Sequence, residues 1–357
     1  MDNGRSRRPG AAAQTGAATL SLVAQRAGVS LATASRVLHG SGGRVVSDAL
    51  RARVFAAASE LRYVSNGPAQ ALARASSPVV GLVVHDVADP YFSAIAAGAM
   101  RVARAHGLMV MLAATFRDRD LELEYLAMLR AQRARGVLLA GSGFTDPGYT
   151  ARLAGQIEAF EQQGGRVALV GQHGVHADAV LPDHRGGAAQ AARYLWELGH
   201  RRIAVICGPR ELETVAHRLE GVRSGLGCVG ARLPEEHVVE ADFTREGGRA
   251  AAIGLLRRIP DVTAIFALND LMAAGVLAAV HDDPRRVVPR DVSVIGFDDL
   301  PHAVDLHPAL TTVRLPLEEI GERALRLILE EEPGVGVRTV PTAATLVVRA
   351  STGPARR

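Results

Sequence analysis

The 357-residue sequence contains no lysine, so all 41 of its basic side chains are arginines, a bias for which GC-rich coding is the simplest explanation. It has only two cysteines, Cys207 and Cys228, which excludes a scaffold held by several disulfides and fits a reducing compartment. No apolar run approaches the roughly 18–20 residues that a membrane helix needs. The N-terminal arginines are followed by small, flexible residues, so no signal peptide is expected and the chain is predicted to be cytoplasmic.

Positive charge is concentrated at the N-terminal end. Residues 1–66 hold nine arginines and three acidic residues, a net charge of +6, whereas the whole chain carries +4. The rest of the chain is therefore mildly acidic, with a net charge of −2. A basic head on a mildly acidic body indicates that a polyanionic partner binds the head alone.

The N-terminal part reads as a small all-α domain. Residues 1–18 are rich in Gly, Ala, Arg and Ser and are expected to form a disordered arm. Between 19 and 65, apolar residues recur at helical spacing in three groups, which predicts three short helices. Three hydroxyl residues stand at the expected N-cap positions: Thr19, Ser30 and Ser47.

The pattern changes after the segment 66–78, which joins the head to the body. Short apolar runs alternate with helical patterns, which predicts parallel sheets with helices on both faces. The units are too many for one small sheet, so two similar lobes are expected, completed by 306–316 and 339–349. Strands are expected at 79–84, 136–140, 167–170, 203–206, 264–267 and 292–295, and helices at 92–106, 121–133, 186–198 and 270–280.

Residues 20–38 have the mechanics of a helix-turn-helix. Ala24 is small where two helices would cross, and Gly28 can adopt the left-handed conformation that ends the first helix. The second helix would then enter a major groove, where Arg36 can donate two hydrogen bonds to guanine. An ordinary helical hairpin is the alternative. Leu31, Ala32 and Arg36 are expected to face base edges, and Thr19, Ser30, Thr33 and Ser35 to contact phosphates.

These residues resemble the head of the lactose-repressor (LacI/GalR) family. The likeness rests on 19–38, on Val46-Ser47 and on 61–66, and it continues over about residues 19–353. It implies a helix-turn-helix head on a two-lobed α/β sensor domain, 79–350, of the periplasmic-binding-protein type. It also implies a nucleoid-associated transcription regulator, expected to be a repressor, that binds operator DNA. A small effector, expected to be a sugar or sugar derivative, would control its operator affinity.

The segment from Asn66 to Ala73 resembles the hinge helix of that family. The resemblance implies that this helix folds on DNA and that Leu72 inserts into the minor groove, with Ala69 at a closely packed position. Such wedges unstack a base step and bend the site. A plain linker leucine is the alternative for Leu72.

Several polar and aromatic residues of the body match effector-contacting positions of the family. Tyr91 and Phe92 follow the first strand, and the other segments also lie at strand ends, where open α/β sheets bind ligands. Arg218 and Asp298 are expected on opposite sides of the cleft, so that an effector favours closed lobes. The predicted effector contacts are Tyr91, Phe92, Asp183, Arg218, Phe243, Asn269 and Asp298.

Two departures from the family pattern weaken any transfer of ligand identity. Leu212 stands where purine-sensing members carry an arginine, which argues against a purine, and His184 replaces the usual Asn beside Asp183. An Asp that follows a strand is also a common helix cap, and a lone Arg is more often a surface residue.

Enzyme interpretations find little support. Gly225-x-Gly227-x-x-Gly230 follows a helical pattern and not a strand, so it is not a dinucleotide fingerprint. His173, His176 and Asp178 are spaced loosely and are interpreted as a solvated surface loop, not as a metal site. No cofactor is expected.

A free-standing solute or sugar receptor is the alternative function, because such receptors resemble residues 79–350. They are exported and lack a DNA-binding head, which disfavours this interpretation. The tail at 351–357 shows no apolar heptads, so the tetramer-forming segment of the lactose repressor itself is not expected. A homodimer is expected, because two heads that read an inverted-repeat operator need two-fold symmetry.

Overall fold

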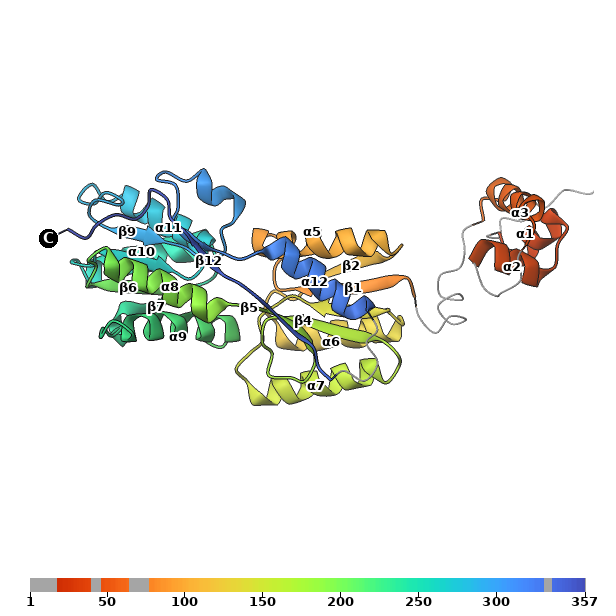
Figure 1. Cartoon of the computed structure of the whole chain (residues 1–357), viewed down its shortest axis with the longest axis horizontal. Helices are drawn as coiled ribbons and strands as arrows, with labels where there is room; N and C mark the ends of the chain where they lie inside the picture. The colour runs from red at the N-terminus through yellow and green to blue at the C-terminus, as the bar shows by residue number, and fades with distance from the viewer. Residues whose placement is uncertain (1–17, 40–45, 64–76, 331–335, 357) are drawn as a thin grey trace, which may run out of the picture. The chain divides into compact units, whose positions relative to one another are not determined.

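The computed structural model describes residues 18–39, 46–63, 77–330 and 336–356, and the chain divides into two compact units, Met1–Arg74 and Ala75–Arg357 (Figure 1). The first unit contains α1 (Leu20–Ala27), α2 (Leu31–His39) and α3 (Asp48–Glu60). These helices bury a small apolar cluster that includes Val23, Ala34 and Val54. The predicted arm at 1–18 lies outside the described residues, apart from Ala18.

Local chemistry explains where the head's first two helices begin and end. The Thr19 hydroxyl accepts a hydrogen bond from the Leu22 N–H, and the Ser30 hydroxyl accepts one from the Thr33 N–H at 3.1 Å. Gly28 has a φ of 63°, the left-handed conformation predicted for it. The prediction for Ser47 was wrong in one respect, because it precedes α3 without making a side-chain cap bond.

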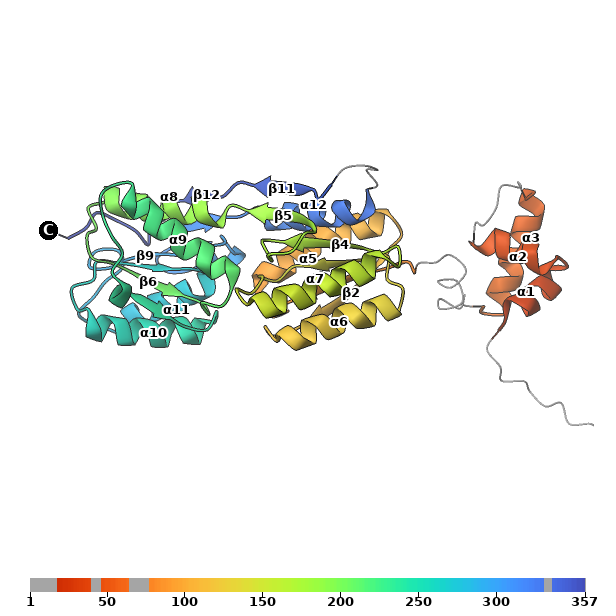
Figure 2. The same cartoon turned by 90° about the horizontal axis from the view of Figure 1, so that it is seen from below.

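The second unit consists of two α/β lobes (Figure 2). The N-terminal lobe has a parallel six-stranded sheet in the order β11-β5-β4-β3-β1-β2, with α5 and α12 on one face and α6 and α7 on the other. Its strands are β1 (Val79–Val84), β2 (Met109–Ala114), β3 (Gly136–Leu139), β4 (Arg166–Val170), β5 (Asp178–Pro182) and β11 (Thr339–Thr342). Its helices are α5 (Pro90–Ala105), α6 (Arg119–Ala131), α7 (Pro147–Glu161) and α12 (Leu317–Leu329).

The C-terminal lobe has a parallel four-stranded sheet in the order β7-β6-β8-β9, with α8 packed on α9 and α10 packed on α11. A two-stranded antiparallel ribbon, β10 with β12, lies beside α8. The strands are β6 (Ile203–Cys207), β7 (Val238–Glu240), β8 (Ala264–Ala267), β9 (Ser293–Ile295), β10 (Thr312–Arg314) and β12 (Thr345–Val347). The helices are α8 (His184–Glu197), α9 (Glu213–Gly227), α10 (Arg245–Arg258) and α11 (Asp270–His281), with 3-10 turns at Glu235–His237 and Pro301–Val304.

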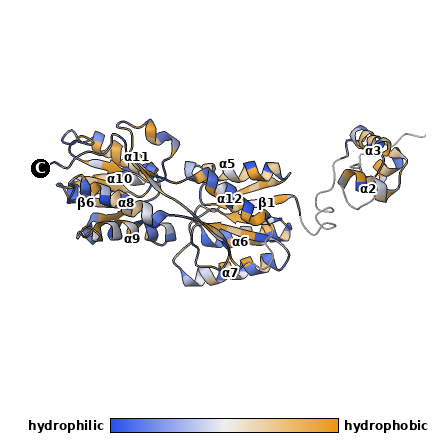
Figure 3. Cartoon of the chain, viewed as in Figure 1, coloured by the Kyte–Doolittle hydropathy of each residue, from blue (hydrophilic) through white to orange (hydrophobic). Residues whose placement is uncertain are grey.

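The chain passes between the lobes three times, after β5, after β10 and after β11. Apolar residues follow the strands and the inner helix faces (Figure 3), and five of the six residues of β1 are buried. The predicted fold class is therefore confirmed: an all-α head is followed by a two-lobed α/β body with parallel sheets.

Candidate functional site

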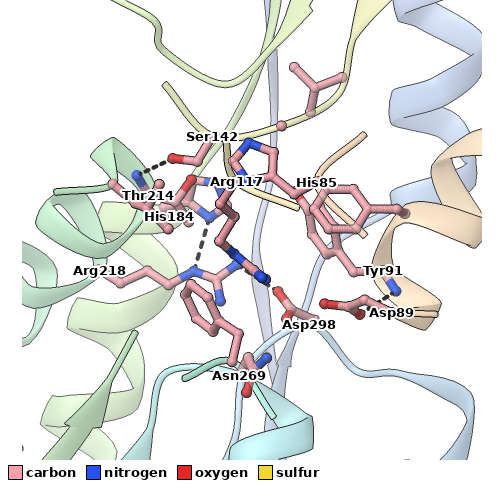
Figure 4. A pocket seen from close by; sticks show the side chains of 15 residues that line it. His85, Asp89, Tyr91, Arg117, Ser142, His184, Thr214, Arg218, Asn269 and Asp298 are labelled. Carbon is pink, nitrogen blue, oxygen red and sulfur yellow. Dashed lines mark hydrogen bonds and ion pairs between the residues drawn. The ribbon is translucent and has the colours of Figure 1, made fainter. Parts of the chain in front are cut away.

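A pocket opens between the two lobes, where loops follow the carboxyl ends of the parallel strands. Its volume, counting the space at its mouth that is open to solvent, is about 510 Å³. The N-terminal lobe contributes His85, Asp89, Tyr91, Phe92, Arg117, Gly141, Ser142 and Val170, and the C-terminal lobe contributes His184, Leu212, Thr214, Arg218, Phe243, Asn269 and Asp298 (Figure 4).

Arg218 lies in α9 and is tied to the protein through three of its nitrogen atoms. Its Nη2 donates to Asp298 Oδ1 at 2.6 Å, its Nη1 donates to the Leu268 carbonyl, and its Nε donates to His184 Nδ1 at 3.3 Å. The guanidinium also lies 3.9 Å from the centre of the Phe297 ring. Arg218 is therefore a fixed, internally neutralised part of the pocket wall.

Asp298 reaches Arg218 because the backbone turns sharply after β9. Asp298 has a φ of 110° and Asp299 a φ of 55°, conformations that non-glycine residues rarely adopt. The Asp299 carboxylate is held away from the pocket by Arg314 and Arg349, each at 2.6 Å. Burial raises the pKa of Asp298 to about 7, against the opposing effect of the Arg218 guanidinium.

Two further polar side chains of the pocket cap helices. The Asp89 carboxylate accepts a hydrogen bond from the Tyr91 N–H at 2.9 Å at the start of α5, and burial raises its pKa. The Asn269 side-chain oxygen accepts one from the Met272 N–H at 2.8 Å at the start of α11. The Asn269 amide nitrogen has no protein partner among the residues described, so it remains able to donate to a ligand.

Neutral aromatic rings form the opposite wall. His85 stacks between Phe92 and Phe144, with ring centres 5.9 and 5.8 Å apart. Burial lowers the pKa of His85 to about 3 and the pKa of His184 well below its usual value. Both imidazoles are therefore uncharged near pH 7 and offer ring faces and nitrogen atoms without a formal charge.

The lobes also touch directly along one side of the pocket. The Thr145 N–H donates to the Glu211 carbonyl at 2.8 Å, and the Glu213 N–H donates to the Gly143 carbonyl at 2.9 Å. Arg119 forms ion pairs with Asp146 of its own lobe and with Glu211 of the other lobe. This short antiparallel pairing brings Ser142 to the Thr214 N–H, which donates to its hydroxyl at 3.0 Å.

Most of the predicted effector contacts lie together. Tyr91, Phe92, Arg218, Phe243, Asn269 and Asp298 all line the one pocket. Asp183 does not: it is exposed and accepts a hydrogen bond from the Gly186 N–H at the start of α8, and its neighbour His184 lines the pocket instead. The expectation that Arg218 and Asp298 face each other across the cleft was wrong, because both belong to the C-terminal lobe and are bonded to one another.

The interpretation of His173 as part of a solvated loop was also wrong. His173 is 2% exposed, whereas His176 is exposed and the Asp178 carboxylate is bound by Arg338. Within the described ranges, no group of three His, Cys, Asp or Glu side chains is arranged to hold a metal ion. The glycine triplet that starts at Gly225 lies at the end of α9, so it does not open a helix.

The first two residues of α2 are its exposed part. Leu31 is 51% exposed and Ala32 is exposed, while Arg36 is partly buried and its Nε lacks a hydrogen-bond partner in the part of the chain described. Two other arginines are used inside the head: Arg53 donates to the Ala27 carbonyl and Arg26 pairs with Glu60. The predicted hinge residues Asn66, Ala69 and Leu72 lie outside the described residues.

Comparison with known proteins matches both units to family models. Residues 19–66 match the model described as bacterial regulatory proteins, lacI family, and residues 77–342 match periplasmic binding proteins and the sugar-binding domain of the LacI family. No helix in the described segments is long and apolar enough to span a bilayer.

Individual relatives agree with these matches. The transcriptional regulator CelR of Thermobifida fusca is 37% identical, covering 88% of this chain and 92% of its own, and GalS of Salmonella typhimurium is 34% identical, covering 88% and 90%. Among solved structures, a CelR–cellobiose complex aligns with a TM-score of 0.69 at 34% identity over 94% and 99% of the two chains. A lac repressor dimer bound to operator and an anti-inducer aligns with a TM-score of 0.81 at 26% identity over 95% and 100%.

Proposed function

This chain belongs to the LacI family of bacterial regulatory proteins and is a DNA-binding transcription regulator, and from that premise we propose that a small effector of the sugar class binds between its lobes and controls its affinity for operator DNA. The observation that carries the proposal is the pocket itself. Residues of both lobes line it, so a ligand there contacts both and favours one arrangement of the lobes.

The chemistry of the pocket suits a polyhydroxylated ligand. Asn269 and Thr214 supply neutral hydrogen-bonding groups, while the Tyr91, Phe92 and Phe243 rings supply apolar faces against which the C–H face of a sugar ring packs. The cellobiose bound by CelR makes the sugar class the first to test. Tyr91, Phe92, Arg218, Phe243, Asn269 and Asp298 are the proposed effector-site residues.

We further propose that the regulator acts as a homodimer in the cytoplasm. Exposed apolar side chains gather on α5, on the loop that precedes it and on the edge strand β2, where Met100, Val87 and Leu112 respectively line a groove. An exposed apolar patch beside an unpaired strand edge fits a second copy of the chain. Two heads held in this way would read an inverted repeat, with α2 in the major groove and the hinge residues Asn66, Ala69 and Leu72 at the minor groove.

The alternative, a sugar receptor without a regulatory role, is tested by deleting residues 1–66. The proposed function predicts that the shortened chain binds the effector as the full chain does and no longer binds operator DNA. The receptor alternative predicts that the full chain itself shows no preference for operator over random DNA. We expect no turnover of the bound sugar in either form.

A further inference from the structure

Arg117 is a charged side chain of the pocket that has no hydrogen-bond or ion-pair partner in the described residues. It lies in the turn between β2 and α6, where Phe116 and Arg117 have φ values of 52° and 64°. This turn directs the Arg117 side chain into the pocket (Figure 4). Within the described residues no carboxylate lies within ion-pairing distance of its guanidinium, and no protein atom accepts a hydrogen bond from it.

The other arginines around the pocket form hydrogen bonds or ion pairs with protein groups. Arg218 donates to Asp298, to the Leu268 carbonyl and to His184, and Arg119 pairs with Asp146 and Glu211. Arg117 makes one contact of note: its guanidinium lies 5.4 Å from the centre of the Phe243 ring, which belongs to the other lobe. A cation held over a ring in this way keeps its N–H donors available at the ring's edge.

None of the remaining charges of the pocket forms an ion pair with Arg117 in the part of the chain described. The Asp298 charge is balanced by Arg218 at 2.6 Å. The Asp89 carboxylate caps the N-terminus of α5, where it accepts a hydrogen bond from the Tyr91 N–H and where the helix dipole balances part of its charge. Burial raises the pKa of Asp89, and the Arg117 charge opposes this shift without a direct bond between the two side chains. His85 and His184 are neutral, because burial lowers the pKa of both. Arg117 is therefore a half-buried cation that faces the ligand space, acts on Asp89 only through its charge, and has no ion-pair partner in the described residues.

We propose that Arg117 is a specificity-determining residue that binds an oxyanion substituent, a carboxylate or a phosphate, so that the effector is an acidic sugar. This inference rests on the proposed function, because it concerns the same pocket. A planar guanidinium offers a carboxylate or phosphate two parallel hydrogen bonds, which neutral hydroxyls do not match in strength. Bound from the N-terminal lobe while Asn269 and Thr214 hold hydroxyls from the C-terminal lobe, such a ligand bridges the cleft.

The test measures binding of matched acidic and neutral sugars to the full chain by titration calorimetry at constant ionic strength. The probes are glucuronate, galacturonate, gluconate and glucose 6-phosphate, with glucose and galactose as the neutral counterparts. The inference predicts that at least one acidic probe binds and that its neutral counterpart binds roughly 10- to 100-fold more weakly. It is overturned if a neutral sugar binds as tightly as its acid, or if none of the acidic probes binds.

Variants separate the charge from the fold. Arg117→Gln should lose the preference for the acid, and Arg117→Lys, which keeps the charge, should restore part of it. Arg135→Gln is the matched control, because Arg135 is an exposed arginine immediately before β3 that does not line the pocket. An Arg117→Gln protein that binds the acid like the parent contradicts the inference. Operator binding by the effector-free parent protein is measured in parallel. If the parent does not bind the operator, the proposed function is wrong. If it binds the operator and a neutral sugar changes that affinity, only this inference is wrong.

Discussion

Arg218 and Asp298 are bonded to each other inside the C-terminal lobe, Nη2 to Oδ1 at 2.6 Å, with side chains 3% and 4% exposed. Removal of one partner leaves the other charge buried without compensation, which costs about 3–5 kcal/mol in other proteins. We therefore expect Arg218→Met to lower the free energy of unfolding by that amount, in addition to any effect on effector binding. The measurement is urea unfolding of Arg218→Met, Asp298→Leu and the double variant. The double variant should be more stable than Arg218→Met alone. If the losses in unfolding free energy of the two single variants simply add up in the double variant, the two charges do not compensate each other and this prediction is wrong.

Stability should also depend on pH through His173. Burial lowers its pKa in the folded protein to about 4, whereas an unfolded histidine titrates near 6.5. Between these values the unfolded chain binds the extra proton, so stability falls as the pH is lowered through this window. From pH 7 to pH 5 this one residue should reduce the free energy of unfolding by about 2 kcal/mol.

His173→Gln should abolish that part of the pH dependence, and it leaves the pocket lining unchanged because His173 is not part of it. The control is His176→Gln, three residues away and exposed. Denaturant unfolding at pH 5 and pH 7 gives the comparison. If the free energy of unfolding falls by the same amount between pH 7 and pH 5 in His173→Gln and in the parent, the buried ring does not titrate as described.

The dimer proposal predicts that Leu112→Asp yields monomers. Leu112 is 42% exposed in the groove between α5 and β2, and a carboxylate there would have to be buried against the second copy. Met128→Asp is the matched control, since Met128 is 48% exposed on α6 and does not line the groove. Sedimentation should show a monomer for Leu112→Asp and a dimer for the control. Operator affinity should fall at least roughly tenfold with the dimer, because two linked heads bind with avidity.

Base readout by the head is tested at Arg36. We expect Arg36→Ala to cost roughly 1–3 kcal/mol of specific affinity and to relax the preference at one base pair of each half-site. Its Nε is buried and has no hydrogen-bond partner in the described head, so the terminal nitrogens of the guanidinium are the atoms expected to meet a base. Selection of binding sites from a random pool is the measurement. Unchanged selectivity would place Arg36 in the head's scaffold.

Much of the fold could be predicted from the sequence, because most strands that are buried on both faces appear in it as short apolar runs. The strands β1, β3, β4, β6, β8 and β9 begin and end within a residue of the predicted ranges, since both faces of each are covered. The edge strand β2 was missed, because its sequence Met-Val-Met-Leu-Ala-Ala is largely exposed and lacks alternation. The short β7, with one buried residue of three, was missed for the same reason.

The missed strand explains a missed site residue. Arg117 follows β2 at its carboxyl end, and without that strand no pattern in the sequence places Arg117 at the pocket. His85 directly follows the predicted strand at 79–84, and its position at the carboxyl end of that strand is a signal for the pocket. The Arg218–Asp298 bond depends on two consecutive residues with positive φ, which no pattern of residue types specifies. The domain boundaries at 19–65, 66–78 and 79–350 stay predictions.

The central claim, that one pocket controls one DNA-binding head, is tested most directly by titrating operator DNA with the full chain in the absence and presence of each acidic and neutral sugar probe. The account predicts that one probe shifts the operator dissociation constant at least about tenfold, because a ligand that prefers one arrangement of the lobes shifts their population. The same probe should leave binding to random DNA unchanged. Operator affinity that is identical with a probe shown by calorimetry to occupy the pocket would contradict the account.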